Sequence, residues 1–101
     1  MKTLGASGLS IGLLGAPNEE QLVWDKGSPV LGYEPSLWRR DAFGSLIYRH
    51  AYGDRSSELG WEIDHVKPTR LGGNDDLQNK RPLHWRANAQ HGGLLGALFH
   101  E

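Results

Sequence analysis

The sequence contains no cysteine. This absence excludes disulfide-stapled scaffolds and every zinc site built on thiolates, including zinc fingers and zinc ribbons. Any metal ion must therefore bind His, Asp, Glu, Asn or backbone oxygen atoms. The sequence also lacks an apolar run of about 18 residues, the length that a membrane-spanning helix needs. No membrane partner is expected.

An excess of charge of one sign is missing as well. The formal net charge of the 101 residues is -1, whereas a protein that coats nucleic acid without sequence preference is normally strongly basic. The middle of the chain is nevertheless locally basic, because residues 37–55 contain four arginines against two aspartates. With 38% hydrophobic residues, the chain is long enough for one small core and too short for two, so a single domain is expected.

The first 17 residues differ from the rest. Leucines and small residues follow a single basic residue, Lys2, which superficially resembles a secretory signal. Four glycines interrupt the apolar run, and Pro17 follows Ala16, where cleavage would fall. We expect a flexible tail over 1–17, with an export signal or a short first helix as alternatives, and a single domain over 18–101. A cytoplasmic location is expected.

The segment before residue 61 is rich in turn-forming residues. Glycine and proline interrupt 18–35, so mostly irregular structure is expected there. Ser36 is a candidate cap for a short helix over 36–41. Aromatic and β-branched residues predict a strand over 43–48, and a loop is expected over 52–57.

The second half of the chain has clearer signals. Residues 61–66 alternate across two faces and predict a strand, which Pro68 ends. A long turn over 72–76 and a second short strand over 80–83 are expected next. Residues 83–90 lack helix breakers and predict a helix of about two turns, with Gly92 and Gly93 as its stop.

Residues that bear metal or acid–base chemistry are concentrated in this half. Asp64 and His65 end the predicted strand, Asn79 closes the turn, and Asn88 lies on the predicted helix. A strand, a looped connection and a helix bring these four within reach of one another. Because adjacent strand residues point to opposite faces, Asp64 and His65 are suited to different roles.

The stretches WEIDHVKP (61–68), DLQN (76–79) and PLHWRAN (82–88), separated by the Gly72-Gly73 turn, resemble the HNH nuclease family. The resemblance covers residues 61–91 and extends less surely back to Trp38. It implies a small α+β domain with a ββα-metal core, preceded here by a short helix and strand segment. It also implies an endonuclease that hydrolyses DNA with one divalent ion and leaves 5′-phosphate and 3′-hydroxyl ends.

The resemblance assigns a role to each motif residue. His65 matches the general base, a role that suits an imidazole because its ordinary pKa lies near neutral pH. Asp64 and Asn88 match the metal ligands, whose oxygen atoms favour magnesium or manganese, with zinc or nickel as further possibilities. Asn79 matches the residue that holds the loop and orients the base.

Other residues are candidates for additional contacts. His84 is a possible further ligand, a phosphate contact or a packing residue. The four tryptophans belong chiefly to the core, with at most one against substrate. The candidates for phosphate contacts are Arg39, Arg40, Lys67 and Arg86, with Arg70, Lys80 and Arg81 as further cations.

Two departures from the family pattern stand out. Relatives often carry paired cysteines for a structural zinc, which are absent here, and a lysine where this chain has His91. Two other interpretations remain open: a non-catalytic module that binds nucleic acid or protein, and a structural protein stabilised by metal. The expected partner is DNA, and a larger phage or restriction protein is a possible second partner.

Overall fold

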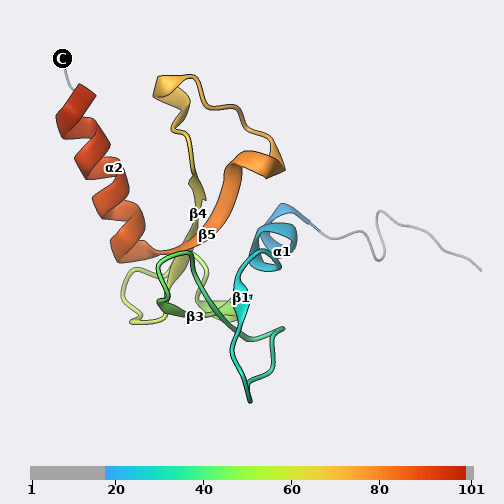
Figure 1. Ribbon diagram of the computed structural model, residues 1–101. Helices are drawn as coiled ribbons and strands as arrows, with labels where there is room; N and C mark the ends of the chain where they lie inside the picture. The colour runs from blue at the N-terminus through green and yellow to red at the C-terminus, as the bar shows by residue number, and fades with distance from the viewer. Residues whose placement is uncertain (1–17, 100–101) are drawn as a thin grey trace, which may run out of the picture.

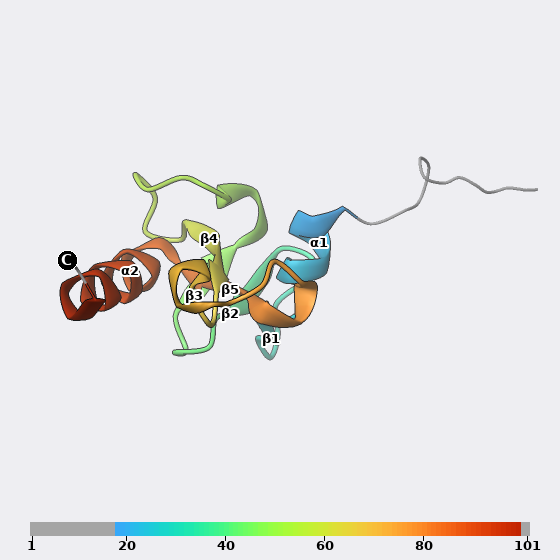
Figure 2. The same ribbon diagram turned by 90° about the horizontal axis from the view of Figure 1, so that it is seen from above.

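The computed structural model describes residues 18–99, with side-chain surroundings up to residue 92. The predicted tail over 1–17 lies outside these residues. The described chain is an α+β domain (Figure 1), in which α1 and α2 lie on opposite sides of the hairpin formed by β4 and β5, as Figure 2 shows from above. No helix among the described residues is both long and apolar enough to cross a membrane.

The first half forms a helix and a small sheet. Helix α1 (Glu19–Trp24) begins at Asn18, whose side chain accepts the backbone N–H of Gln21 at 2.8 Å. Two glutamates in its first turn complement the helix dipole. Strands β1 (Ser28–Pro29), β2 (Trp38–Arg40) and β3 (Leu46–Tyr48) then form an antiparallel sheet in that order.

The hydrophobic core lies between α1, β3 and the start of β4. Val23, Trp24, Ile47 and Trp61 are fully buried, and Ile63 packs against them. The Trp24 and Trp61 rings lie 5.1 Å apart, a favourable tilted arrangement. The tryptophans at these two positions are core residues, as expected.

The second half contains two strands followed directly by a helix. Strands β4 (Trp61–His65) and β5 (Lys80–His84) pair antiparallel, with Asp64 opposite Arg81 and His65 opposite Lys80. Helix α2 (Trp85–Phe99) starts at the next residue and lies beside the hairpin (Figure 1). This is the ββα order expected from the motif.

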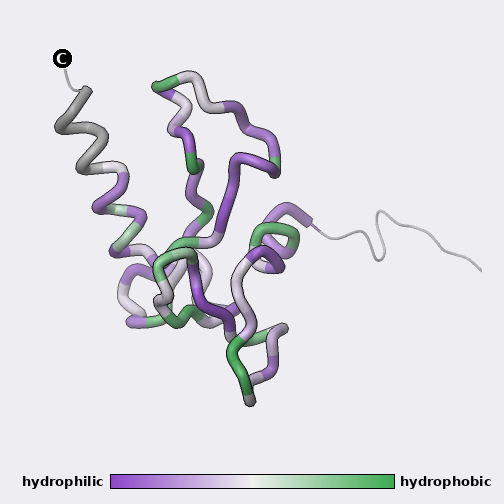
Figure 3. The backbone as a smooth tube through the Cα atoms, viewed as in Figure 1, coloured by the Kyte–Doolittle hydropathy of each residue, from purple (hydrophilic) through white to green (hydrophobic). Residues whose placement is uncertain are grey.

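The connection over 66–79 is polar and tightly folded. Figure 3 shows that the hairpin and this connection are mostly hydrophilic. Gly72 ends a short 3-10 turn with φ of 92°, a conformation that favours glycine. A Cβ atom on Gly73 would lie 1.7 Å from the Lys67 carbonyl oxygen, so only glycine fits there.

Three expectations about local structure were wrong. Residues 38–40 form strand β2 instead of a helix, because they pair with both β1 and β3. The strand expected over 43–48 begins only at Leu46, since 42–44 form a turn closed by Asp41. Helix α2 starts at Trp85 instead of residue 83 and continues past Gly92 and Gly93, because glycine costs only about 1 kcal/mol in a helix interior.

Candidate functional site

The motif residues gather where the end of β4 faces the first turns of α2. Asp64, His65, Asn88 and His91 line one cavity of about 280 Å³, and Arg70 from the connection completes its rim. Asp64 and His65 come from β4, and Asn88 and His91 lie one turn apart on α2. The structure therefore brings three of the four residues chosen from the sequence into one cavity.

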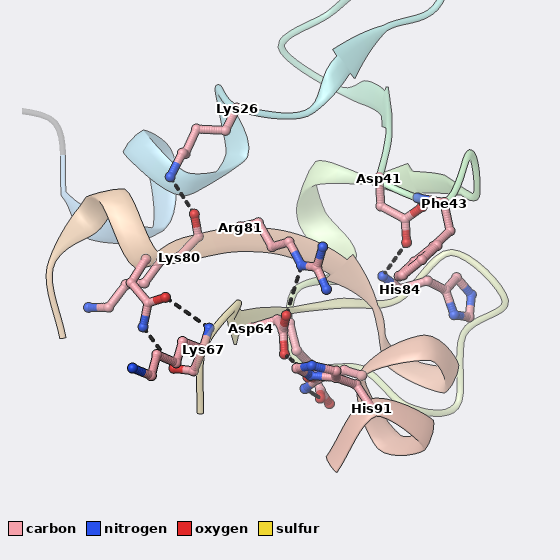
Figure 4. A network of polar contacts seen from close by, with 12 residues as sticks. Lys26, Asp41, Phe43, Asp64, Lys67, Lys80, Arg81, His84 and His91 are labelled. Carbon is pink, nitrogen blue, oxygen red and sulfur yellow. Dashed lines mark hydrogen bonds and ion pairs between the residues drawn. The ribbon is translucent and has the colours of Figure 1, made fainter. Parts of the chain in front are cut away.

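Asp64 is the buried acidic group of this cavity, with 4% of its surface exposed. Its Oδ2 accepts from Arg81 Nε at 2.8 Å, and its Oδ1 lies 2.9 Å from His91 Nδ1. Figure 4 shows Asp64 between Arg81 on β5 and His91 on α2. The carboxylate is thus fixed by both neighbouring elements, and Oδ1 is the oxygen on the helix side.

A second contact between β4 and α2 fixes Asn88. Asn88 Nδ2 donates to Glu62 Oε1 at 2.7 Å. Arg55 donates to the same carboxylate through two nitrogens, at 2.6 and 2.8 Å. The hydrogen bond from Arg55 lowers the pKa of Glu62, burial partly opposes this, and the Asn88 bond lowers it further. Because an ionised carboxylate can only accept, it holds the amide NH₂ and leaves Asn88 Oδ1 as the free end.

His65 has a carboxylate partner of its own. Its Nε2 lies 2.8 Å from Asp75 Oδ1 in the connection. The bond to His65, followed by that to Lys80, lowers the pKa of Asp75, so this carboxyl is ionised at neutral pH. When the ring is neutral, Nε2 therefore carries the proton that is donated to Asp75, and Nδ1 has the lone pair. This is the tautomer that a histidine base adopts when a carboxylate orients its ring.

Asn79 closes the connection onto the end of β4. Its Oδ1 accepts the Lys67 N–H at 2.9 Å, and its Nδ2 donates to the carbonyls of Lys67 and Asn74 at 2.9 and 2.8 Å. The Asn79 carbonyl also accepts the Val66 N–H at 2.8 Å. These bonds hold the backbone on both sides of Asp75. Asn79 does not line the Asp64 cavity; it lines a neighbouring one with Lys67.

The donor set of the Asp64 cavity suits a divalent cation. It offers a carboxylate oxygen, an amide oxygen and an imidazole nitrogen, all of which are common ligands. No three His, Cys, Asp or Glu side chains converge as a metal site within the described part of the chain. Any ion bound in this cavity would therefore need the Asn88 amide oxygen or solvent beside Asp64.

His84 does not belong to this cavity. It ends β5, and its 7% exposed ring accepts from Arg86 N–H through Nδ1 at 3.1 Å while Nε2 contacts the Glu58 carbonyl at 2.8 Å. One accepting and one donating nitrogen satisfy the neutral ring completely. The expectation that His84 shares a helix face with Asn88 was wrong, because the helix begins after it. Its position supports the packing alternative.

The predicted phosphate contacts fall into two groups. Arg39 donates to the carbonyls of Asp25, Gly27 and Pro35 and so holds loops together. Arg86 forms a bidentate salt bridge with Glu58. Arg40 and Lys67 are exposed, and Arg40 donates one bond to Gly44. Of the further cations, Lys80 and Arg81 are paired with acidic side chains, whereas Arg70 lies on the cavity rim.

A larger cavity of about 700 Å³ lies beside the first turns of α2. It is lined chiefly by Phe43, Leu46, Leu59 and Ala87, with His84 and His91 at its edge. Its apolar walls offer no acid–base pair like that of His65 and Asp75. We therefore base the functional argument on the smaller, polar cavity.

Sequence reasoning missed the residues that orient the motif. Glu62 precedes Asp64 by two positions on the same face of a strand, so the alternation pattern was a signal that could have identified it. His91 was noticed only as a departure from the family pattern. Asp75 had no local signal, because its contact with His65 depends on how the connection folds.

Comparison of the chain with known proteins finds no matching family model, curated protein or solved structure.

Proposed function

We propose that this protein is a metal-dependent endonuclease of the HNH type that hydrolyses DNA phosphodiester bonds. The observation that carries the proposal is the single cavity lined by Asp64, His65 and Asn88, at the junction of a ββα unit. The products would be 5′-phosphate and 3′-hydroxyl ends. A cytoplasmic location, where DNA is accessible, belongs to the same proposal.

His65 acts as the general base. Asp75 holds the Nε2 proton, so Nδ1 keeps the lone pair that accepts a proton from the attacking water. The ionised Asp75 also stabilises the imidazolium that results, as an orienting acid does in other hydrolases. Asn79 positions this pair by fixing the backbone of the connection.

Asp64 Oδ1 and Asn88 Oδ1 would hold the ion, magnesium or manganese in the first instance. When bound, such an ion supplies positive charge to the phosphate and to the departing 3′ oxygen. Glu62 keeps the Asn88 amide turned so that its oxygen is free, and Arg81 keeps Asp64 in place. Arg70 and Lys67 line the two cavities of this region, and they bind flanking phosphates.

The low net charge indicates modest intrinsic affinity for DNA. A larger phage or restriction protein that delivers the substrate is therefore a second element of the proposal.

A nicking assay on supercoiled plasmid tests the proposal. The parent should cut with Mg²⁺ or Mn²⁺, and His65→Ala should lose activity by about 10²- to 10⁴-fold. His50→Ala is the matched control, because His50 is exposed and lies outside the cavity. Cutting that survives His65→Ala would refute the assignment of the base.

Calorimetry on Asp64→Ala tests the ligand assignment separately. Divalent-ion affinity should fall, and an unchanged affinity would count against Asp64. If the parent does not cut DNA with Mg²⁺, Mn²⁺, Zn²⁺ or Ni²⁺, the proposal that it is a nuclease is wrong. DNA binding without cutting would then favour the non-catalytic module, and a chelator that only lowers the melting temperature would favour the structural metal protein.

A further inference from the structure

His91 is the cavity residue that the proposed reaction leaves without a role. It lies on α2 three positions after Asn88, and its side chain is 24% exposed. Its Nδ1 is 2.9 Å from Asp64 Oδ1, and Figure 4 shows the ring turned toward Asp64. Asp64 Oδ1 is the oxygen assigned to the ion, so an imidazole nitrogen adjoins the position of the metal.

The contacts between β4 and α2 explain why His91 Nδ1 lies next to Asp64. Glu62 and Asp64 lie two positions apart on one face of β4, and Asn88 and His91 lie one turn apart on α2. Glu62 contacts Asn88, and Asp64 contacts His91. The two rows run side by side, so that three donor atoms belong to one wall of the cavity: Asp64 Oδ1, Asn88 Oδ1 and His91 Nδ1.

The distance between the two closest donors agrees with shared coordination. Two ligands at right angles on an octahedral ion, each about 2.1 Å from it, are about 3.0 Å apart. Asp64 Oδ1 and His91 Nδ1 are 2.9 Å apart without any ion. In this contact Nδ1–H donates to the Asp64 carboxylate, so an ion would take the place of that proton. Nδ1 would release the proton, the neutral ring would be protonated on Nε2, and a small shift of either side chain would let both atoms face one cation.

We infer that His91 is a third side-chain ligand of the ion, through Nδ1, and that it raises the affinity of the cavity for borderline ions such as Ni²⁺, Co²⁺ and Zn²⁺ more than its affinity for Mg²⁺. Imidazole nitrogen suits these ions, whereas carboxylate, carbonyl and water oxygens suit Mg²⁺. The inference rests on the proposed function for the position of the ion. It does not depend on DNA being the substrate.

The competing role for His91 is a hydrogen bond that merely ties α2 to β4. In that case His91 adds nothing to metal selectivity. His91→Gln separates the two roles, because glutamine can still donate a hydrogen bond to Asp64 but has no imidazole nitrogen. His91→Ala removes both.

The experiment is calorimetric titration with NiCl₂ and with MgCl₂ of the parent, His91→Ala, His91→Gln and the control His50→Ala. Both His91 variants should bind Ni²⁺ more weakly by at least the roughly 10- to 100-fold that loss of an outer partner of a metal site causes. Mg²⁺ affinity should change much less, and His50→Ala should match the parent.

A second readout needs no variant. Adding ZnCl₂ to the parent should shift the imidazole nitrogen signal of His91 Nδ1 in the NMR spectrum and leave that of His50 in place. An unmoved His91 signal, or Ni²⁺ affinity that is equal in parent and His91→Gln, would overturn the inference. The nicking assay distinguishes the two proposals. If the parent cuts DNA but its Ni²⁺ affinity does not depend on His91, only this inference is refuted. If Ni²⁺ binds through His91 but the parent does not cut, only the nuclease proposal is refuted.

Discussion

The two halves of this small domain are stabilised by different forces. Around α1 and β3, four fully buried apolar residues, two of them tryptophans in ring contact, form the core. Between residues 62 and 92, Leu83 is fully buried, but the other buried side chains include Asp64, Lys80 and His84, each with polar partners. Hydrophobic burial accounts for the first half, and hydrogen bonds and ion pairs order the second.

The difference indicates a division of labour. Apolar burial is non-directional and contributes most of the free energy of folding, whereas a hydrogen bond contributes only about 1 kcal/mol net but fixes atoms in space. A cavity that must aim carboxylate, amide and imidazole groups needs the second kind of interaction. The core then has to supply the stability that the polar half lacks.

Trp24→Ala should have the largest effect on stability. Removing a fully buried ring that contacts Trp61 and donates to the Pro35 carbonyl at 3.0 Å should lower the free energy of unfolding by about 3–5 kcal/mol. Urea denaturation followed by circular dichroism measures it. Leu31→Ala, at a 99% exposed residue, is the matched control and should change stability by less than about 0.5 kcal/mol.

If Trp24→Ala leaves no folded state to measure, Trp24→Phe keeps an apolar ring and should show a smaller loss in the same direction. A loss of less than about 1 kcal/mol for both variants would contradict the comparison. It would mean that the polar half is the stabilising one.

The polar half was the easier to predict from the sequence. The β4–β5 hairpin and the following helix come from local patterns: alternation over 61–65, the Pro68 stop, and a run without breakers after Leu83. In contrast, Trp38–Arg40 forms a strand because it pairs with residues six to ten positions further on, which no local propensity reveals. Short segments of this kind are decided by tertiary context.

The same physical reason separates the predictable from the unpredictable part of the cavity. Asp64, Asn79 and Asn88 were chosen through the resemblance to the HNH motif, and their positions follow from the order of two strands and a helix. The partners Asp75 and His91 depend on the path of the connection and on the rotation of α2 about its axis. A rotation by one residue would turn His91 away from Asp64, so these contacts require coordinates.

Asn79→Ala should have the next largest effect, now within the polar half. The change removes three side-chain hydrogen bonds that close the connection, at a cost of about 1–3 kcal/mol. The Lys67 amide should exchange its hydrogen faster, and plasmid cutting should fall more than metal affinity because the ligands lie on β4 and α2. Hydrogen exchange, nicking and calorimetry measure the three quantities.

Gln78→Ala is the neighbouring control, since Gln78 is exposed and should tolerate the change. If Asn79→Ala strongly weakened metal affinity while the cutting rate at saturating metal stayed normal, Asn79 would belong with the ligands. The assignment of Asn79 to the connection would then be wrong.

Glu62→Gln should have the smallest effect on stability, and that effect should depend on pH. The pKa of Glu62 is lowered in the folded state, so its ionised form stabilises the fold above the ordinary value of 4.5. That contribution is lost as the pH falls through the lowered pKa. We therefore expect the variant to be about 0.5 kcal/mol less stable than the parent at neutral pH, with the gap closing in acid. Urea midpoints at a series of pH values measure it.

Glu58→Gln provides the control, because Glu58 also accepts two bonds from an arginine but is 77% exposed and lies outside the Asp64 cavity. Both variants lose a carboxylate, yet only Glu62→Gln frees Asn88 from an obligate acceptor. A glutamine can offer Asn88 either its oxygen or its NH₂ group, so the amide is no longer held in one direction. Metal affinity should therefore fall in Glu62→Gln alone; an equal fall in both variants would show that net charge, and not the direction of Asn88, sets the affinity of the cavity.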